Sequence, residues 1–316
     1  MPKAALLLPV TGASAELGLS MQRATRLAQS GGDEKAAFAL FNTSDTAEGA
    51  GQAAADAMAN NSAFILGPLF GRQIQAVTAA VAGRVPAISF SNGNAVPGSG
   101  IFLFGITPSQ SVSAILQYAS ARGVRRVALI GTDTSWSEES GKAAHRLASE
   151  IGLRLVDAPG SNVLQALQTI GLPDAALLTG GPQQFAALAP ALQASGVQVL
   201  GTLQAIDHSD AGKAALEGAW LSAPDPASLN AFARASEVAG GIASGVIAAL
   251  AFDAARIVEE LARTDTLNVN GLLRQSGFDG IAGAVRFRAD GRCVRELAIL
   301  VCTSGTFRSV ARKAGL

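Results

Sequence analysis

The chain has 316 residues with 24 basic and 24 acidic side chains, so its formal net charge is zero. Apolar residues make up 49% and charged residues only 15%, which predicts a compact body with a large buried core. The neutral charge and the lack of long basic runs argue against nucleic-acid binding. The uncharged stretches are too short, or too often broken by Pro, Ser and Gly, to cross a membrane.

The first third of the chain alternates short apolar runs with helical patterns, which predicts parallel βαβ units. Strands are expected near 4–9, 36–41, 63–66, 86–90 and 101–104, and helices near 16–29, 47–60 and 71–82. The start of the second helix is marked by Thr46 together with Glu48.

The same alternation then repeats. Strands are expected near 125–130, 153–157, 175–178, 197–201 and 219–221, and helices near 111–121, 138–150 and 183–195. A duplicated βαβ array predicts an α/β protein with two similar lobes, each a doubly wound parallel sheet. A cleft between such lobes is the expected place for a ligand.

The last third begins at two prolines, Pro224 and Pro226. Helices are expected near 227–237 and 242–263, followed by a hairpin of 284–288 with 294–301 around the turn residues Asp290 and Gly291. The pattern breaks at three places, near 105–108, 222–226 and 295–298. We expect the chain to cross between the lobes at these places, which would form a three-strand hinge. The predicted N-terminal lobe is 1–106 plus 224–295, and the predicted C-terminal lobe is 107–223 plus 296–316.

Enzyme chemistry finds little support in the residue types. His145 and His208 lack metal-ligand spacing, and no dinucleotide or phosphate-binding loop follows a strand. We expect His145 on a surface and the polar segment 207–210 to cap a helix. Cys293 and Cys302 lie on one extended run, about 30 Å apart at ~3.3 Å per residue, which predicts two buried thiols. The sequence therefore predicts a protein that is no enzyme and has neither cofactor nor metal site.

Several short motifs follow one another along the chain. They are Leu-Pro-Val-Thr-Gly at 8–12, Asn-Thr-Ser-Asp at 42–45, Ala-Glu-Gly-Ala at 47–50, Ile-Leu-Gly-Pro-Leu-Phe-Gly at 65–71, Val-Pro-Ala-Ile-Ser-Phe-Ser-Asn at 85–92, Phe-Gly-Ile-Thr-Pro at 104–108 and Phe-Asp-Ala at 252–254. In order and spacing they resemble the type I periplasmic binding proteins of the leucine/isoleucine/valine-binding class. Segments 67–70 and 90–92 most resemble the penicillin-binding protein activators.

The resemblance implies a type I periplasmic-binding-protein fold and a non-catalytic, ligand-binding function. Its closest form is an activator-like envelope protein that regulates peptidoglycan synthesis through a partner synthase. A second reading is the solute receptor of an ABC importer, docking to a permease and binding an amino acid or another small polar molecule. A cytoplasmic enzyme or sugar sensor on a similar fold is a third. The first two imply a periplasmic location, with a leader absent from this sequence, because Met1-Pro2-Lys3 runs straight into the first strand.

Candidate ligand-binding residues follow the carboxyl ends of predicted strands, where loops and helix N-termini present free backbone N–H groups. In the first lobe they are Thr11, Gly67, Pro68, Leu69, Phe70, Gly71, Ser91 and Asn92. In the second lobe they are Ser135, Trp136, Gly181 and Gln204. The resemblance assigns Trp136 the place of an aromatic that stacks on an amino-acid ligand.

Each candidate also has a plain structural reading. The glycines suit tight strand-to-helix turns, Phe70 suits a core plug, and Asn92 suits a turn beside Gly93. The second lobe offers Gln204 where amino-acid receptors hold the ammonium group with a carboxylate, and a buried ammonium without such a partner is costly. Amino-acid binding therefore requires that Asp207 or Glu138 face the ligand.

Overall fold

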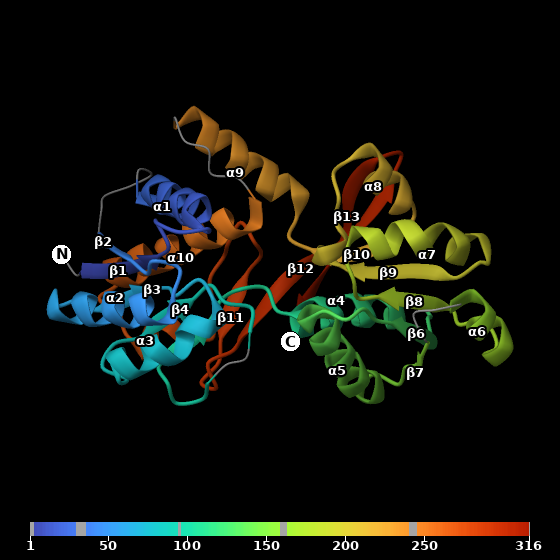
Figure 1. Ribbon diagram of the computed structural model, residues 1–316, viewed down its shortest axis with the longest axis horizontal. Coiled ribbons are helices and arrows are strands. Elements are labelled where there is room, and N and C mark those ends of the chain that lie inside the picture. The colour runs from blue at the N-terminus through green and yellow to red at the C-terminus, as the bar shows by residue number, and fades with distance from the viewer. Residues whose placement is uncertain (1–2, 30–35, 94–95, 159–162, 240–244, 316) are drawn as a thin grey trace. The chain divides into compact units, whose positions relative to one another are not determined.

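The computed structural model describes residues 3–29, 36–93, 96–158, 163–239 and 245–315. The chain folds into two compact units (Figure 1). Unit 1 comprises Met1–Ile106 with Ala227–Val294, and unit 2 comprises Thr107–Pro226 with Arg295–Leu316. The start of the helix expected over 242–263 lies outside the described residues.

Unit 1 is built on a parallel sheet. Its strands are β1 (Lys3–Leu8), β2 (Ala37–Asn42), β3 (Phe64–Leu66), β4 (Ala87–Ser89) and β5 (Ile101–Leu103), in the order β2-β1-β3-β4-β5. The order reverses between β1 and β3, so the loops after these two strands lie side by side at the carboxyl edge. Such a reversal is where open parallel sheets bind ligands.

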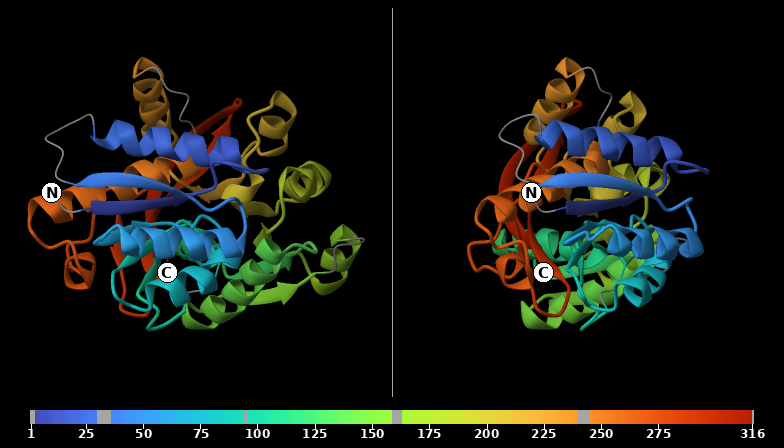
Figure 2. Two further views of the ribbon diagram at one scale, coloured as in Figure 1. Left: turned by 60° about the vertical axis from the view of Figure 1, so that its left-hand side comes forward. Right: turned by 90° about the vertical axis from the view of Figure 1, so that its left-hand side faces the viewer.

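Helices cover both faces of this sheet, as Figure 2 shows for α1 and α2 around β1 and β2. Helices α1 (Ala15–Gln29) and α10 (Gly245–Arg263) pack on the face that carries Leu6 and Leu8. Helices α2 (Ala47–Ala59) and α3 (Ile74–Val81) cover the opposite face, with Leu7 in their core. Successive β1 side chains enter different cores because a strand alternates its faces, so an unbroken apolar run is required. Unit 1 also contains η1 (Gly71–Gln73), α9 (Pro226–Val238), α11 (Val269–Leu272) and β11 (Val285–Phe287).

Unit 2 repeats this arrangement. Its parallel strands are β6 (Arg126–Ile130), β7 (Arg154–Asp157), β8 (Ala175–Leu178), β9 (Gln198–Thr202) and β10 (Trp220–Ala223), in the order β10-β9-β8-β6-β7. Strand β12 (Cys293–Thr303), which belongs to unit 2 from Arg295 on, runs antiparallel to β10, and β13 (Thr306–Gly315) runs antiparallel to β12. The order reverses between β6 and β8.

Two groups of helices cover the sheet of unit 2. Helices α6 (Val163–Ile170) and α7 (Pro182–Ala194) share a core with Ile130 and Leu178. Helices α4 (Pro108–Ala121) and α5 (Ser135–Glu150) pack against each other, and α4 also contacts β9 and β10. Short elements η2 (Leu203–Ala205) and α8 (Asp210–Ala215) follow β9.

The structure confirms the predicted fold class, two doubly wound α/β sheets, and most predicted elements within a few residues. It adds α6, α11 and β13, which the sequence pattern did not predict. Strand β13 alternates exposed and half-buried residues with few large apolar side chains, so its pattern is weak. Cys293 and Cys302 lie on β12 as buried thiols that are not joined in a disulfide, as predicted. Among the helices described, none is long and apolar enough to span a membrane.

Candidate ligand-binding site

The turn after β3 contains the predicted residues Gly67 to Gly71 and is fixed by backbone constraints. Gly67 has φ +126°, and a Cβ there would lie 2.4 Å from the carbonyl oxygen of Leu7. Its N–H donates to the carbonyl oxygen of Ile88 at 2.7 Å, and the peptide bond to Pro68 is cis. Only glycine fits this conformation and this close approach, which supports the structural reading of Gly67.

The turn lies against the loop after β4, so two predicted segments meet. The hydroxyl of Ser89 and the N–H of Phe90 both donate to the carbonyl oxygen of Pro68, at 2.9 and 3.0 Å. A Cβ on Gly71 would lie 3.2 Å from Oγ of Ser91. Gly71 is exposed, whereas Ser91 is buried and accepts the N–H of Gly93 at 3.0 Å.

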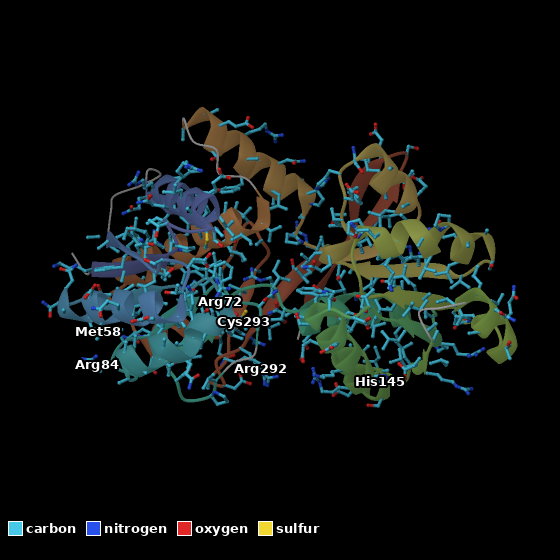
Figure 3. The ribbon with its side chains drawn as sticks, in the orientation of Figure 1. Met58, Arg72, Arg84, His145, Arg292 and Cys293 are labelled. Carbon is cyan, nitrogen blue, oxygen red and sulfur yellow. The ribbon has the colours of Figure 1, made fainter. Side chains whose placement is uncertain are left out.

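The two apolar candidates of this turn take different positions. Leu69 is 5% exposed and belongs to the core of unit 1. Phe70 is half-buried, packs against that core, and has the guanidinium carbon of Arg72 4.2 Å from its ring centroid. Of these two side chains, that of Phe70 is therefore the more accessible to a ligand or partner. Figure 3 labels Arg72 at the start of η1.

A polar network at the ends of β1 and β2 was not foreseen, apart from Thr11. The Nδ2 group of Asn42 donates to Oγ1 of Thr11 at 2.9 Å. Asp45, at φ +57°, accepts a hydrogen bond from Ser14 Oγ at 2.9 Å and forms an ion pair with Arg72. Asn42 is the last residue of β2 and Asp45 lies in the loop after it, and this place at the carboxyl end of a strand is the signal that could have identified them.

Unit 2 brings three of its four predicted residues together. The indole N–H of Trp136 donates to Oγ1 of Thr202 at 3.2 Å, and the same oxygen accepts the N–H of Gln204 at 3.4 Å. A Cβ on Gly181 would lie 3.7 Å from the carbonyl oxygen of Gln204. Thr202, the last residue of β9, joins these residues and was missed in the sequence.

Two predicted residues stand apart from these groups. Ser135 is exposed in the first turn of α5, whose cap is Thr134, an acceptor for the N–H of Ser137 at 3.2 Å. Asn92 is exposed beyond Ser91, at the border of the undescribed residues 94–95.

The carboxylate of Asp207 is committed to its own turn. It accepts the N–H of Ser209 at 2.8 Å, and a Cβ on Gly212 would lie 2.3 Å from its carboxyl carbon. The hydrogen bond from the Ser209 N–H lowers the pKa of Asp207, with a smaller contribution from His208. Ser209 in turn caps α8 by accepting the N–H of Gly212 at 3.0 Å, which confirms that segment 207–210 caps a helix.

These edges contain hydroxyls, amides, glycine turns and two aromatic rings, which are typical of a ligand-binding surface on a parallel sheet. Across the part of the chain that the structure describes, no group of His, Cys, Asp and Glu side chains could hold a metal ion. Two α/β units of this kind define a binding protein of the type I periplasmic class.

The chain belongs to the periplasmic binding protein family, whose model matches residues 2–306. Members of this family bind small ligands. No curated protein matches the chain in sequence.

Solved structures share the fold over nearly the whole chain. A protein from Rhodospirillum rubrum, described as a branched-chain amino acid ABC transporter, has a TM-score of 0.81 and 23% identity, with 98% of this chain and 99% of that chain covered. The C-domain of LpoA from Haemophilus influenzae, a regulator of PBP1A, gives 0.78 and 16%, with 98% and 100% covered. The leucine-binding protein LivK from Thermotoga maritima gives 0.62 and 18%, with 99% and 98% covered.

Proposed function

We propose that this protein is a non-catalytic, periplasmic regulator of peptidoglycan synthesis, acting on a partner synthase as the penicillin-binding protein activators do. The observation that carries the proposal is the end of β9. The family resemblance puts Gln204 where an amino-acid receptor has a carboxylate, and the carboxylate of Asp207 accepts the N–H of Ser209. Thr202, Gly181 and Gln204 offer no charged partner to an α-ammonium group bound beside Trp136, and Glu138 lines a cavity whose lining does not include Trp136.

The similarity to the C-domain of LpoA, a regulator of PBP1A, supports the same proposal at the level of the fold. The motif resemblance of segments 67–70 and 90–92 points the same way. The Gly67 turn and the β4 loop are joined by hydrogen bonds to Pro68, so this edge of unit 1 is a rigid surface that a partner could recognise.

The test is a reconstituted reaction. The purified chain is added to class A penicillin-binding proteins in vitro, and glycan polymerisation and peptide cross-linking are measured with and without it. Stimulation of one synthase that is lost in Phe70→Ala but retained in Leu40→Ala, the control at an exposed apolar side chain, supports the proposal. No stimulation of any synthase, together with no binding, contradicts it.

A second candidate function, the solute receptor of an importer, is favoured by Trp136. Its ring is held by Thr202 beside Gly181 and Gln204, as an aromatic wall for a ligand would be. Mass spectrometry of co-purifying small molecules and a thermal-shift screen of amino acids and small carboxylates test this candidate. A ligand whose binding is lost in Trp136→Ala supports the receptor, and an unresponsive protein supports the regulator.

A further inference from the structure

Unit 2 contains a cavity of about 800 Å³ whose lining includes neither Trp136 nor its neighbours Gly181 and Gln204. It opens at the carboxyl edge of the sheet, where the strand order reverses between β6 and β8. Its walls come from the start of α5, the start of α7 and the end of β7. This position and volume are typical of small-molecule sites in parallel α/β sheets.

Buried hydroxyls and a fixed amide form the polar part of the wall. Oγ of Ser137 and Oγ1 of Thr179 lie 2.6 Å apart, and Ser137 also accepts the N–H of Thr132 at 2.8 Å. The amide of Gln184 donates to the carbonyl oxygens of Ile130 and Gly131, each at 3.1 Å, and accepts the N–H of Gly180 at 2.7 Å. These hydrogen bonds hold the polar wall in one arrangement.

The charged residues that line the cavity are all acidic. Asp133, Glu138 and Asp157 contribute carboxylates, and the residues that line the cavity include no Lys, Arg or His. Two basic side chains approach from outside the lining: Nε2 of His145, which Figure 3 labels on α5, lies 3.0 Å from Asp157, and Nζ of Lys142 lies 2.7 Å from Glu139. Glu138 also stands in the first turn of α5, where its charge complements the helix dipole.

We propose that this cavity is a binding site for a small organic cation, whose ammonium or guanidinium groups pair with Asp133, Glu138 and Asp157. The carbon chain between the charged groups would lie on the apolar part of the lining, Leu129, Ala158, Ala187 and Leu188. Hydrogen bonds from a cation to carboxylates are stronger than those between neutral groups. A bare metal ion fits less well, because the described acidic residues do not form a metal-holding group.

The proposal is tested by isothermal titration calorimetry of the full chain at low ionic strength with putrescine, agmatine and spermidine. We expect saturable binding of at least one of them at one site per chain, weakened by added salt. We expect Glu138→Gln and Asp133→Asn each to weaken that binding about five- to tenfold. The neutral analogue 1,4-butanediol should not bind. Absence of binding by all three amines would overturn the proposal.

A matched control distinguishes amine binding in the cavity from amine binding to acidic side chains elsewhere on the surface. Glu139 is the next residue on α5, pairs with Lys142 and does not line the cavity. Glu139→Gln should therefore leave amine binding unchanged, and an equal loss in Glu138→Gln and Glu139→Gln would mean that the amines bind the surface only. Amine binding is measured without any synthase, so its outcome is independent of the proposed regulatory function.

Discussion

The indole N–H of Trp136 donates a hydrogen bond to Oγ1 of Thr202 at 3.2 Å. The bond joins the first turn of α5 to the end of β9, and these two elements lie far apart in the sequence. Thr202 also accepts the N–H of Gln204, so a single hydroxyl orients an aromatic ring and a loop. This relationship predicts how the ring responds when the hydroxyl is removed.

We predict that Thr202→Val loosens the Trp136 ring and destabilises the protein by about 1 kcal/mol, the usual net value of one hydrogen bond. The chain has two Trp residues, so Trp220→Phe provides a background in which only Trp136 emits. Emission at longer wavelength and stronger quenching by iodide should follow. Thr202→Ser, which keeps the hydroxyl, should match the parent, and an unchanged spectrum in Thr202→Val would contradict the contact.

Gly67→Ala should be among the most damaging single changes in unit 1. The added Cβ would approach the carbonyl oxygen of Leu7 to 2.4 Å, and the φ of +126° is unfavourable for any L-residue. We expect a loss of more than about 3 kcal/mol in urea unfolding. Gly83 also has positive φ, +70°, but open space around its Cβ position. Gly83→Ala should cost only about 1 kcal/mol, and equal losses in the two variants would contradict this account.

Asp253 stabilises the loop that follows α11. This side chain on α10 is 2% exposed, and its carboxylate accepts the N–H groups of Ile281 at 2.7 Å and Ala282 at 2.9 Å. Asp253→Ala removes the carboxylate that accepts the half-buried N–H of Ile281 and the buried N–H of Ala282, so we expect a loss of about 3 kcal/mol in the free energy of unfolding. Asp56→Ala on the exposed face of α2 is the control, with an expected change within about 0.5 kcal/mol. A loss as small for Asp253→Ala would show that the loop does not depend on the carboxylate.

Asp174 predicts a pH dependence of stability. Its Oδ2 atom accepts the N–H groups of Arg125 and Arg126, each at 2.8 Å. These hydrogen bonds, that from Arg126 first, lower the pKa of the Asp174 carboxyl below its ordinary value of 3.8. A lowered folded-state pKa stabilises the protein above the unfolded-state value, and this stabilisation is lost as the pH falls through the folded-state value.

The corresponding experiment compares the parent with Asp174→Ala across pH. At pH 7 the parent should be more stable by about 1 kcal/mol. The expected difference is small because Asp174 is exposed, so water can in part replace the lost hydrogen bonds. The difference should shrink as the pH is lowered through and below 3.8, the ordinary value. A difference that stays constant from neutral to acid pH would contradict the role of the ionised carboxylate.

The apolar runs predict much of the fold by themselves. Runs such as Leu6-Leu7-Leu8 require cores on both faces, and helix-covered parallel sheets provide them. The duplication of the βαβ array predicted the second sheet for the same reason. Strand β13 escaped prediction because its side chains are mostly exposed or half-buried, so burial imposes little pattern on it.

The candidate site could be predicted only in part. Gly67 and Trp136 follow strand ends, and this position together with the family resemblance selected them as candidates. The residues that contact them carry no such signal in the sequence. Thr202 is the last residue of a strand, and Leu7 lies within one. Their roles depend on contacts between segments that are distant along the chain, which local patterns do not encode.

Local patterns by themselves determined the α/β fold class of this protein, because hydrophobic periodicity and turn residues act over a few neighbours. The tertiary structure decided which polar side chains remain available. It commits Asp207 to Ser209 and gathers Asp133, Glu138 and Asp157 around one cavity. The physical reason is that hydrogen bonds and charges act through space, and the order of the strands sets the distances between these side chains.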